Sequence, residues 1–261
     1  CSNQNFGGRS EKEKITNNTL GGLFKIKLKN HLIFFDVGGP PKKSFSKSYQ
    51  SGPLSFEYYL DGVKIITNCG FGNNISNKAE LLSRLTACQS TLTLNDTTVT
   101  KFERNKLINR VFGNSIKNSF ETYDVNIKDE KDLIGCSVSH NGYEKNFGCT
   151  HRREIYLDKK NNYIKGCDHI VKRKDGMPIR YVFRFHINPK LTVVKTINGN
   201  SALIQISKNK SLLFTVKDEA LEVEKSIYLG GKKIVDNPCI TIIGNLVNKN
   251  KLLNWEIKKN L

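Results

Sequence analysis

The stretch from residue 54 to residue 70 (LSFEYYLDGVKIITNCG) constrains the fold more than any other part of the sequence. Apolar residues occupy every second position from Leu54 to Leu60, and this period of two is typical of a strand with one buried face. Asp61-Gly62 follows, and the pair supplies the positive φ angles that a two-residue type I′ turn requires. We therefore expect a hairpin in which 54–60 pairs with 63–68, with Val63 on the buried side.

Strand-like runs recur along the rest of the chain at intervals of about 10 to 12 residues, with turn-forming residues between them. No βαβ alternation, internal repeat or long amphipathic helix is visible, so the pattern predicts an all-β fold. We expect a large antiparallel β-sandwich (a super-sandwich) of about a dozen or more strands. A short helical turn is expected at 78–85, and 102–132 is interpreted as an extended excursion. The other predicted strands are 23–30, 31–37, 90–94, 136–140, 152–157, 163–171, 181–187, 191–197, 202–207, 212–217, 221–228, 239–246 and 252–258.

The charge of the chain is strongly positive. Lys and Arg number 42 against 24 Asp and Glu, a formal net charge of +18. Such a field favours polyanionic partners: nucleic acid, acidic polysaccharide or anionic membrane. A bias of the whole sequence toward Lys, Asn and Ile explains the charge equally, because no Lys/Arg block stands out. No run of 18 apolar residues predicts a membrane span, and only the charge suggests nucleic acid, since no recognition motif for it is present.

The seven cysteines are odd in number and include no C-x-x-C pair, which argues against a disulfide framework and favours a reducing compartment. Most of them are interpreted as small buried hydrophobic residues. One constellation offers a different interpretation: Cys149, His151, Cys167 and His169 lie on the two arms of a predicted hairpin. Residues i and i+2 share a face of a strand, so these four side chains could converge as a structural zinc site, although their spacing is not a known zinc pattern.

Several ordered segments resemble heparinase II/III-like polysaccharide lyases of the alphaproteobacterial type. LSFEYYLDGVKIITNCG (54–70) resembles the family's L-S-F-E-L…G…L-I-V-D-x-G. RLTACQSTLTLNDT (84–97) is similar to R-S-T-A-A-H-N-T-V-x-L-D-x-x. FFDVGGPP (34–41) resembles D-A-G-P-P, and HRREIYLDKKNNYIKGCDHI (151–170) resembles an H-x-R-R-L-x-L…D-x-L hairpin. RYVFRFHINP (180–189) and SIYLGG (226–231) are similar to late strands of the same branch.

The resemblance implies a domain organisation and an activity. Residues 1–19 are expected to be a lead-in and 20–261 the family's C-terminal β-sandwich, without the N-terminal α/α toroid of full-length members. Cys1 then marks an internal cut, in preference to the lipid-anchored terminus that a first cysteine also allows. These enzymes cleave uronic-acid glycans by β-elimination, which needs a base for the C5 proton and an acid for the leaving oxygen. A bacterial source is implied; the resemblance favours the periplasm, whereas the free cysteines favour the cytoplasm.

The chain departs from the family at the acid/base and metal positions. Ser48, Gln50 and Gly52 stand where the family has H-x-H-x-D, Asn68 replaces its Asp, and Gln89 replaces the His of H-N-T. Amides do not titrate near pH 7 and are poor zinc ligands, so we expect no metal and no cofactor. The replacements favour a binding surface whose acid/base groups are lost or relocated. The alternative is that these amides only satisfy hydrogen bonds of their loops.

Three basic residues complete the candidate substrate-binding set with Asn68 and Gln89. Arg84 matches the family's Arg and is expected to pair with a substrate carboxylate, unless it is a packing residue. His151 and Arg153 match the H-x-R-R strand, and Arg153 either lines a groove or forms a cross-strand salt bridge. Three hypotheses remain: a lyase half that acts on acidic polysaccharide together with a toroid, an inactive glycan-binding module, and a non-specific nucleic-acid binder.

Overall fold

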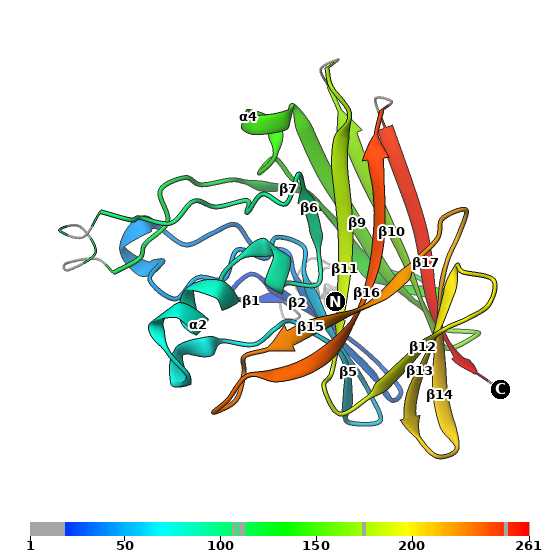
Figure 1. Ribbon diagram of the computed structural model, residues 1–261. Coiled ribbons are helices and arrows are strands. Elements are labelled where there is room, and N and C mark those ends of the chain that lie inside the picture. The colour runs from blue at the N-terminus through cyan, green and yellow to red at the C-terminus, as the bar shows by residue number, and fades with distance from the viewer. Residues whose placement is uncertain are drawn as a thin grey trace, which may run out of the picture.

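The computed structural model describes residues 19–105, 107, 109, 113–173, 176–247 and 250–260, and strands dominate this part of the chain (Figure 1). Several strands bury alternate residues, as β3 (His31–Asp36) does along its whole length. They pair antiparallel in two sheets, which confirms the predicted all-β sandwich.

Among the described residues, the first sheet contains nine strands, in the order β1-β2-β3-β4-β5-β11-β16-β15, with β6 paired to β11. In the same part of the chain the second sheet contains eight, in the order β12-β13-β14-β17-β10-β9-β8-β7. The bounds in the first sheet are β1 Thr19–Leu20, β2 Leu23–Leu28, β4 Phe56–Leu60, β5 Val63–Thr67, β6 Leu92–Leu94, β11 Ile179–Ile187, β15 Glu222–Tyr228 and β16 Val235–Leu246. Those in the second are β7 Thr122–Asp129, β8 Leu133–His140, β9 Cys149–Asp158, β10 Tyr163–Lys172, β12 Thr192–Lys195, β13 Ser201–Ser207, β14 Lys210–Val216 and β17 Asn250–Asn260.

The predicted hairpin is present as β4 and β5. Asp61 has φ 51° and Gly62 has φ 78°, as a type I′ turn requires. A bulge pairs Tyr58 with Ile66 and Tyr59 with Lys64, so Ile65 is the extra residue. The expectation for Val63 was wrong: it is 38% exposed, because it lies beside the turn at the end of the sheet.

Short helices connect the strands on one side of the sandwich. The predicted helix at 78–85 is present as α2 (Asn77–Ser83), and the Ser76 side chain caps it by accepting a hydrogen bond from the Ala79 N–H. The excursion at 102–132 contains β7 and, among its described residues, an isolated bridge between Phe102 and Ile116. Further helices with described bounds are η1 Lys43–Phe45, η2 Gly72–Asn74, η3 Thr86–Cys88 and α4 Glu144–Phe147. No helix among the described residues is long and apolar enough to cross a membrane.

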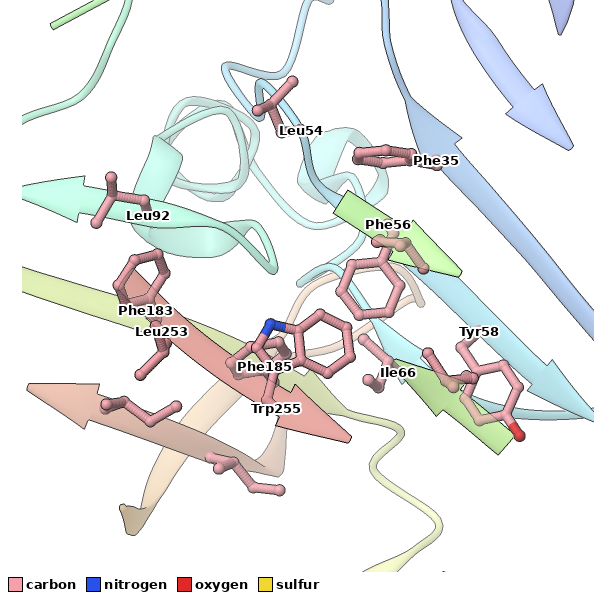
Figure 2. Packing of buried hydrophobic residues seen from close by; sticks show 14 of the residues in the cluster. Phe35, Leu54, Phe56, Tyr58, Ile66, Leu92, Phe183, Phe185, Leu253 and Trp255 are labelled. Atoms are coloured by element: carbon pink, nitrogen blue, oxygen red, sulfur yellow. The ribbon is translucent and has the colours of Figure 1, made fainter. Parts of the chain in front are cut away.

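Aromatic side chains fill the space between the two sheets (Figure 2). Trp255 of β17 stacks on Phe56 of β4, with ring centroids 5.6 Å apart, and meets Phe185 of β11 edge to face at 5.1 Å. A Cβ at Gly166, on the neighbouring strand β10, would lie 2.1 Å from the Trp255 ring, so only glycine fits there. The core therefore packs β17, and with it β10, against the first sheet.

Candidate functional site

The three amides at the family's site positions line one cavity of about 390 Å³. We call it the amide pocket. Its walls come from β2, β3, β4 and the loops that precede β4 and follow β5 and η3. The lining residues are Leu23, Phe34, Asp36, Gln50, Ser55, Phe56, Glu57, Tyr59, Asn68 and Gln89. Sequence positions up to 66 residues apart are thus brought together, from Leu23 to Gln89. Ser48, the remaining polar replacement, is exposed and does not line the pocket.

Contacts with Ser83 and Gln50 hold the Gln89 side chain in place. Its Nε2 donates to the Ser83 carbonyl at 2.8 Å and lies 3.4 Å from the Gln50 Oε1, and the side chain is only 2% exposed. A Cβ at Gly52 would lie 2.8 Å from the Gln89 Cγ. An aspartate at position 52, as in the family, would therefore displace Gln89, so the replacements at 52 and 89 fit each other.

Asn68 combines a structural bond with a free donor. Its Oδ1 accepts the Ser90 backbone N–H at 2.8 Å. Among the described residues, no hydrogen bond uses its Nδ2 group. Loop bonding, the alternative for these amides, is thus present, yet Asn68 keeps two N–H donors for a molecule in the pocket.

Asp36 is the pocket residue that the sequence interpretation missed. Burial raises the pKa of its carboxyl to about 7, against the opposing effect of the Gly38 N–H that donates to Oδ1 at 3.2 Å. The side chain keeps partial solvent contact at the end of β3. Its position inside the FFDVGGPP run, which resembles the family, was the signal that could have identified it.

The surroundings of Asp36 are short of positive charge. No Lys or Arg of the described chain lines the pocket, and its second carboxylate, Glu57, already binds Lys64 Nζ at 2.8 Å and the Tyr59 hydroxyl at 3.1 Å. The Tyr49 hydroxyl is buried without a partner in the described chain, and its pKa is raised by burial and then by Asp36. Asp36 thus has no counter-ion among the described lining residues, so no positive charge there offsets the burial that raises its pKa.

Arg84 lies behind the pocket wall. It is fully buried, its Nε donates to the Tyr49 carbonyl at 2.8 Å, and its second nitrogen donates to the Ser46 carbonyl at 2.9 Å. Its guanidinium lies 4.2 Å from the centroid of the Phe102 ring. These contacts support the packing alternative for Arg84: it shapes the loop that carries Gln50, and nothing places it against a substrate.

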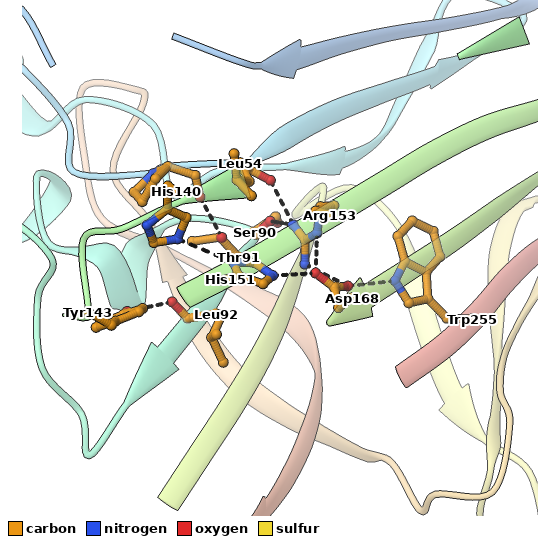
Figure 3. Close-up of polar contacts among 11 residues, drawn as sticks. Leu54, Ser90, Thr91, Leu92, His140, Tyr143, His151, Arg153, Asp168 and Trp255 are labelled. Carbon is orange, nitrogen blue, oxygen red and sulfur yellow. Dashed lines mark hydrogen bonds and ion pairs between the residues drawn. The ribbon is translucent and has the colours of Figure 1, made fainter. Parts of the chain in front are cut away.

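His151 and Arg153 lie between the sheets, in a group we call the interior cluster: His140, His151, Arg153, Asp168 and Trp255 (Figure 3). Arg153 and Asp168 are opposite each other in the β9–β10 register, with Nε 2.7 Å from Oδ1. Both are fully buried, so the cross-strand salt bridge is the alternative that the structure supports, and a groove-lining role for Arg153 is not.

Hydrogen bonds satisfy Asp168 from three sides. Besides Arg153, His151 Nε2 lies 2.7 Å from Oδ1 and Trp255 Nε1 donates to Oδ2 at 2.8 Å. Burial raises the pKa of Asp168, but the Arg153 charge and the bonds from His151 outweigh it and hold that pKa at about 2. Burial lowers the pKa of His140 and of His151 below the usual value. His151 therefore acts as a neutral structural donor that no substrate reaches.

The interior cluster nevertheless supports the amide pocket. One Arg153 nitrogen donates to the carbonyls of Leu54 at 2.9 Å and Ser90 at 2.7 Å. Leu54 has φ 58°, a left-handed conformation that is uncommon for leucine. The Ser90 N–H, in turn, binds Asn68. A chain of contacts therefore runs from the buried ion pair to the pocket wall.

The zinc hypothesis for the β9–β10 hairpin is contradicted by the register. Cys149 and His151 face the interior and are fully buried, whereas Cys167 and His169 lie on the outer face. Cys149 pairs with Lys172, an odd number of residues from Cys167, so the two ligand pairs point to opposite faces. No group of three His, Cys, Asp or Glu side chains in the described chain could hold a metal ion.

Comparisons with known proteins agree with this architecture. The family profile described as "Heparinase II/III-like, C-terminal" matches residues 14–256. The solved structure of a mutant of the heparan sulfate lyase HepC from Pedobacter heparinus is similar, with TM-score 0.72, 14% identity, and coverage of 91% of this chain and 35% of that one. The heparinase III BT4657 gene product has TM-score 0.69, 12% identity, and coverage of 92% and 35%.

At such identities the two structures show the fold alone, and this chain spans only about a third of their length, 35%. No match was found among the curated proteins. The family profile, by contrast, covers nearly the whole chain and agrees with the sandwich observed. The chain therefore belongs to the heparinase II/III-like family and corresponds to its C-terminal domain.

Proposed function

We propose that this chain is the glycan-binding half of a lyase that cleaves uronic-acid-containing acidic polysaccharide by β-elimination. An α/α toroid of the kind that full-length family members carry would supply the other wall of the site. Family membership supports the reaction class, and the names of the similar structures support an acidic glycan as the substrate class. One observation carries the proposal: the residues at the family's site positions, Gln50, Asn68 and Gln89, line a single cavity together with Asp36.

Asp36 gives this pocket the titratable group that its amides lack. With its pKa at about 7, the carboxyl is protonated in a large fraction of molecules at neutral pH. In that form it donates a hydrogen bond to a uronate carboxylate, and the Asn68 Nδ2 group is a second donor. In the ionised form it is a candidate base. A positioned acid or base contributes roughly 10² to 10⁴ in rate.

The charge of the chain acts at longer range. The described lining of the pocket contains no cation, so the net charge of +18 draws a polyanion toward the surface while neutral donors contact the sugar. We expect affinity for a uronate glycan to fall as salt rises, because exposed charges are screened over about 8 Å at physiological ionic strength. Equal affinity for a neutral glycan would count against the proposal.

Binding to a heparan sulfate tetrasaccharide, measured by calorimetry, tests the pocket. Asn68→Ala is expected to weaken binding roughly 5- to 30-fold, which corresponds to about 1–2 kcal/mol for a lost hydrogen bond. Asn209→Ala, in the exposed turn between β13 and β14, is the matched control and should bind as the unchanged chain does. Unchanged affinity of the Asn68 variant would overturn the assignment of the pocket.

The inactive binding module remains the second candidate, because three amides replace groups that titrate or bind metal in the family. Asp36→Asn separates the two, since it keeps the shape and removes the titration. We expect no unsaturated, ultraviolet-absorbing product from this chain alone. In a protein that includes the toroid, product that is lost on Asp36→Asn supports the lyase, whereas tight binding without any product supports the inactive module.

A further inference from the structure

Two cysteines lie directly behind the amide pocket. Cys69 follows Asn68 in the chain and Cys88 precedes Gln89, and the Cys69 N–H donates to the Cys88 carbonyl at 2.8 Å. This single backbone bond holds the two residues side by side, which is compatible with the Cα separation of roughly 4.4–6.8 Å that disulfides span. Both thiols are free, and they interact through a side-chain hydrogen bond.

The two thiols differ in exposure and acidity. Cys69 is 1% exposed, whereas Cys88 keeps partial solvent contact. The hydrogen bond from Cys69 lowers the pKa of Cys88, and the positive charge of Arg184 lowers it further. The same bond, with burial, raises the pKa of Cys69. Because the thiolate is the nucleophile, Cys88 is the sulfur that reacts first with a molecule from solution.

A histidine lies beside the buried thiol. His186 Nε2 lies 3.0 Å from the Ala87 carbonyl, which can only accept, so this nitrogen carries the hydrogen. Its Nδ1 is then an acceptor, 3.6 Å from the Cys69 Sγ and 3.2 Å from the Ser226 Oγ. Burial lowers the pKa of His186 to about 4, so the ring is neutral at pH 7. It therefore accepts a hydrogen bond from the Cys69 thiol and is too weak a base to take its proton.

We propose that Cys69 and Cys88 form a reversible disulfide that links the two segments bearing Asn68 and Gln89. The Cys88 thiolate attacks a low-molecular-weight disulfide, RS–SR, forming a mixed disulfide and releasing one RS⁻. The Cys69 sulfur then attacks the Cys88 sulfur as its proton passes to the RS⁻ released in the first step. The Cys69–Cys88 bond forms, the second RS⁻ leaves, and RS–SR is reduced to two thiols. This site does not depend on the proposed function.

A third sulfur provides the competing outcome. Cys239 is buried opposite His186 in the β11–β16 register. The other buried cysteines, Cys136 and Cys149, are matched controls, because they show no interaction with another cysteine in the described chain. The backbone bond that joins Cys69 directly to Cys88 favours this pair over a Cys88–Cys239 link.

The experiment incubates the folded chain with oxidised glutathione, alkylates the remaining thiols in denaturant, and maps the peptides by mass spectrometry. We expect a Cys69–Cys88 cross-link that dithiothreitol reverses, with Cys136 and Cys149 alkylated. Cys69→Ser should instead trap Cys88 as the mixed disulfide with glutathione. The urea midpoint should rise on oxidation of the unchanged chain and stay constant in Cys69→Ser, because only the first closes a loop in the unfolded state.

Three results would overturn the proposal: alkylation of both cysteines at every glutathione ratio, a stable mixed disulfide on Cys88 in the unchanged chain, or a Cys88–Cys239 cross-link. The mapping needs no bound glycan, so it also stands if the glycan-binding experiment fails.

Discussion

Two polar groups, distant in the chain but joined through the contacts of Arg153 and Asn68 with Ser90, differ in almost every physical respect. The interior cluster around Asp168 is fully buried, and its ion pair is hydrogen-bonded from both sheets (Figure 3). The amide pocket is partly open. Among the described residues, Asp36 forms no ion pair there, and no hydrogen bond uses the Nδ2 donors of Asn68. A buried ion pair thus lies between the sheets, whereas three amides line the open pocket.

This difference shows why residue type is a poor guide to the site. Arg and His are the residue types expected to bind a uronate, yet in this chain Arg84, His151 and Arg153 are each fully buried. A buried arginine without a partner costs several kcal/mol, and both arginines donate to acceptors of their own protein: Arg84 to two backbone carbonyls, and Arg153 to Asp168 and two backbone carbonyls. The polar groups that line the pocket are instead three amides, the hydroxyls of Ser55 and Tyr59, and the carboxyls of Asp36 and Glu57.

The largest effect is expected at the interior ion pair. Asp168→Asn leaves Arg153 buried without its charge partner, so we expect the free energy of unfolding to fall by roughly 3–5 kcal/mol. Urea unfolding measures it. The matched control is Glu154→Gln, which removes the partner of Arg152 from a pair about one-third exposed and should cost less than about 1 kcal/mol. Equal losses in the two variants would contradict the contrast between buried and exposed ion pairs.

The two groups should also respond to pH with opposite signs. The histidines of the interior cluster have pKa values lowered by burial, so the unfolded chain binds protons that the folded chain excludes, and stability is lost as pH falls below about 6.5. Asp36 has its pKa raised to about 7, so the folded chain holds a proton that the unfolded chain releases, and stability is lost as pH rises from about 4 to 7.

Asp36→Asn separates these contributions. The variant lacks the Asp36 titration, which destabilises the unchanged chain at high pH. We therefore expect its free energy of unfolding to exceed that of the unchanged chain by on the order of 1–3 kcal/mol at pH 8 and to equal it at pH 4. Between pH 5 and 6.5 the stability of the variant should rise more steeply with pH than that of the unchanged chain. Urea unfolding across the pH range measures both, and a variant that loses stability at pH 8 would show that a further contact stabilises the ionised Asp36.

A smaller effect is expected inside the pocket. Gly52→Ala places a Cβ 2.8 Å from the Gln89 Cγ and 3.0 Å from the Ser55 Oγ, and we expect a loss of roughly 1–2 kcal/mol. Gln89→Ala should remove much of that clash, so the double variant should lose less than the sum of the two single ones. Strict additivity of the unfolding free energies would show that Gly52 and Gln89 are not adapted to each other.

Local patterns in the sequence predicted much of the fold. The alternation of apolar and polar residues and the Asp61-Gly62 pair predicted the hairpin, because both the strands and the turn depend on neighbouring residues. Pairings between distant segments could not be predicted in this way. The zinc hypothesis failed because the register of β9 on β10 sets which face each arm presents, and this register is invisible in the spacing of Cys149 and Cys167.

Only part of the candidate site could be predicted, because it too depends on contacts between distant segments. Resemblance to the family identified Gln50, Asn68 and Gln89, and the structure brings them together. The raised pKa of Asp36 follows from burial by segments on either side of it, so its sequence context gave no measure of it. The partner of Arg153, Asp168, likewise became visible only when β9 and β10 were paired.

The most direct test observes both groups in one titration with a uronate oligosaccharide. Trp255 is the only tryptophan, so its indole N–H, which binds Asp168, is a single unambiguous NMR reporter of the interior cluster. The side-chain amide signals of Gln50, Asn68 and Gln89, assigned from single substitutions, report on the pocket. We predict that these amide signals shift to saturation while the Trp255 signal stays in place. A shift of the Trp255 signal with the amide signals unmoved would contradict the assignment of binding to the amide pocket.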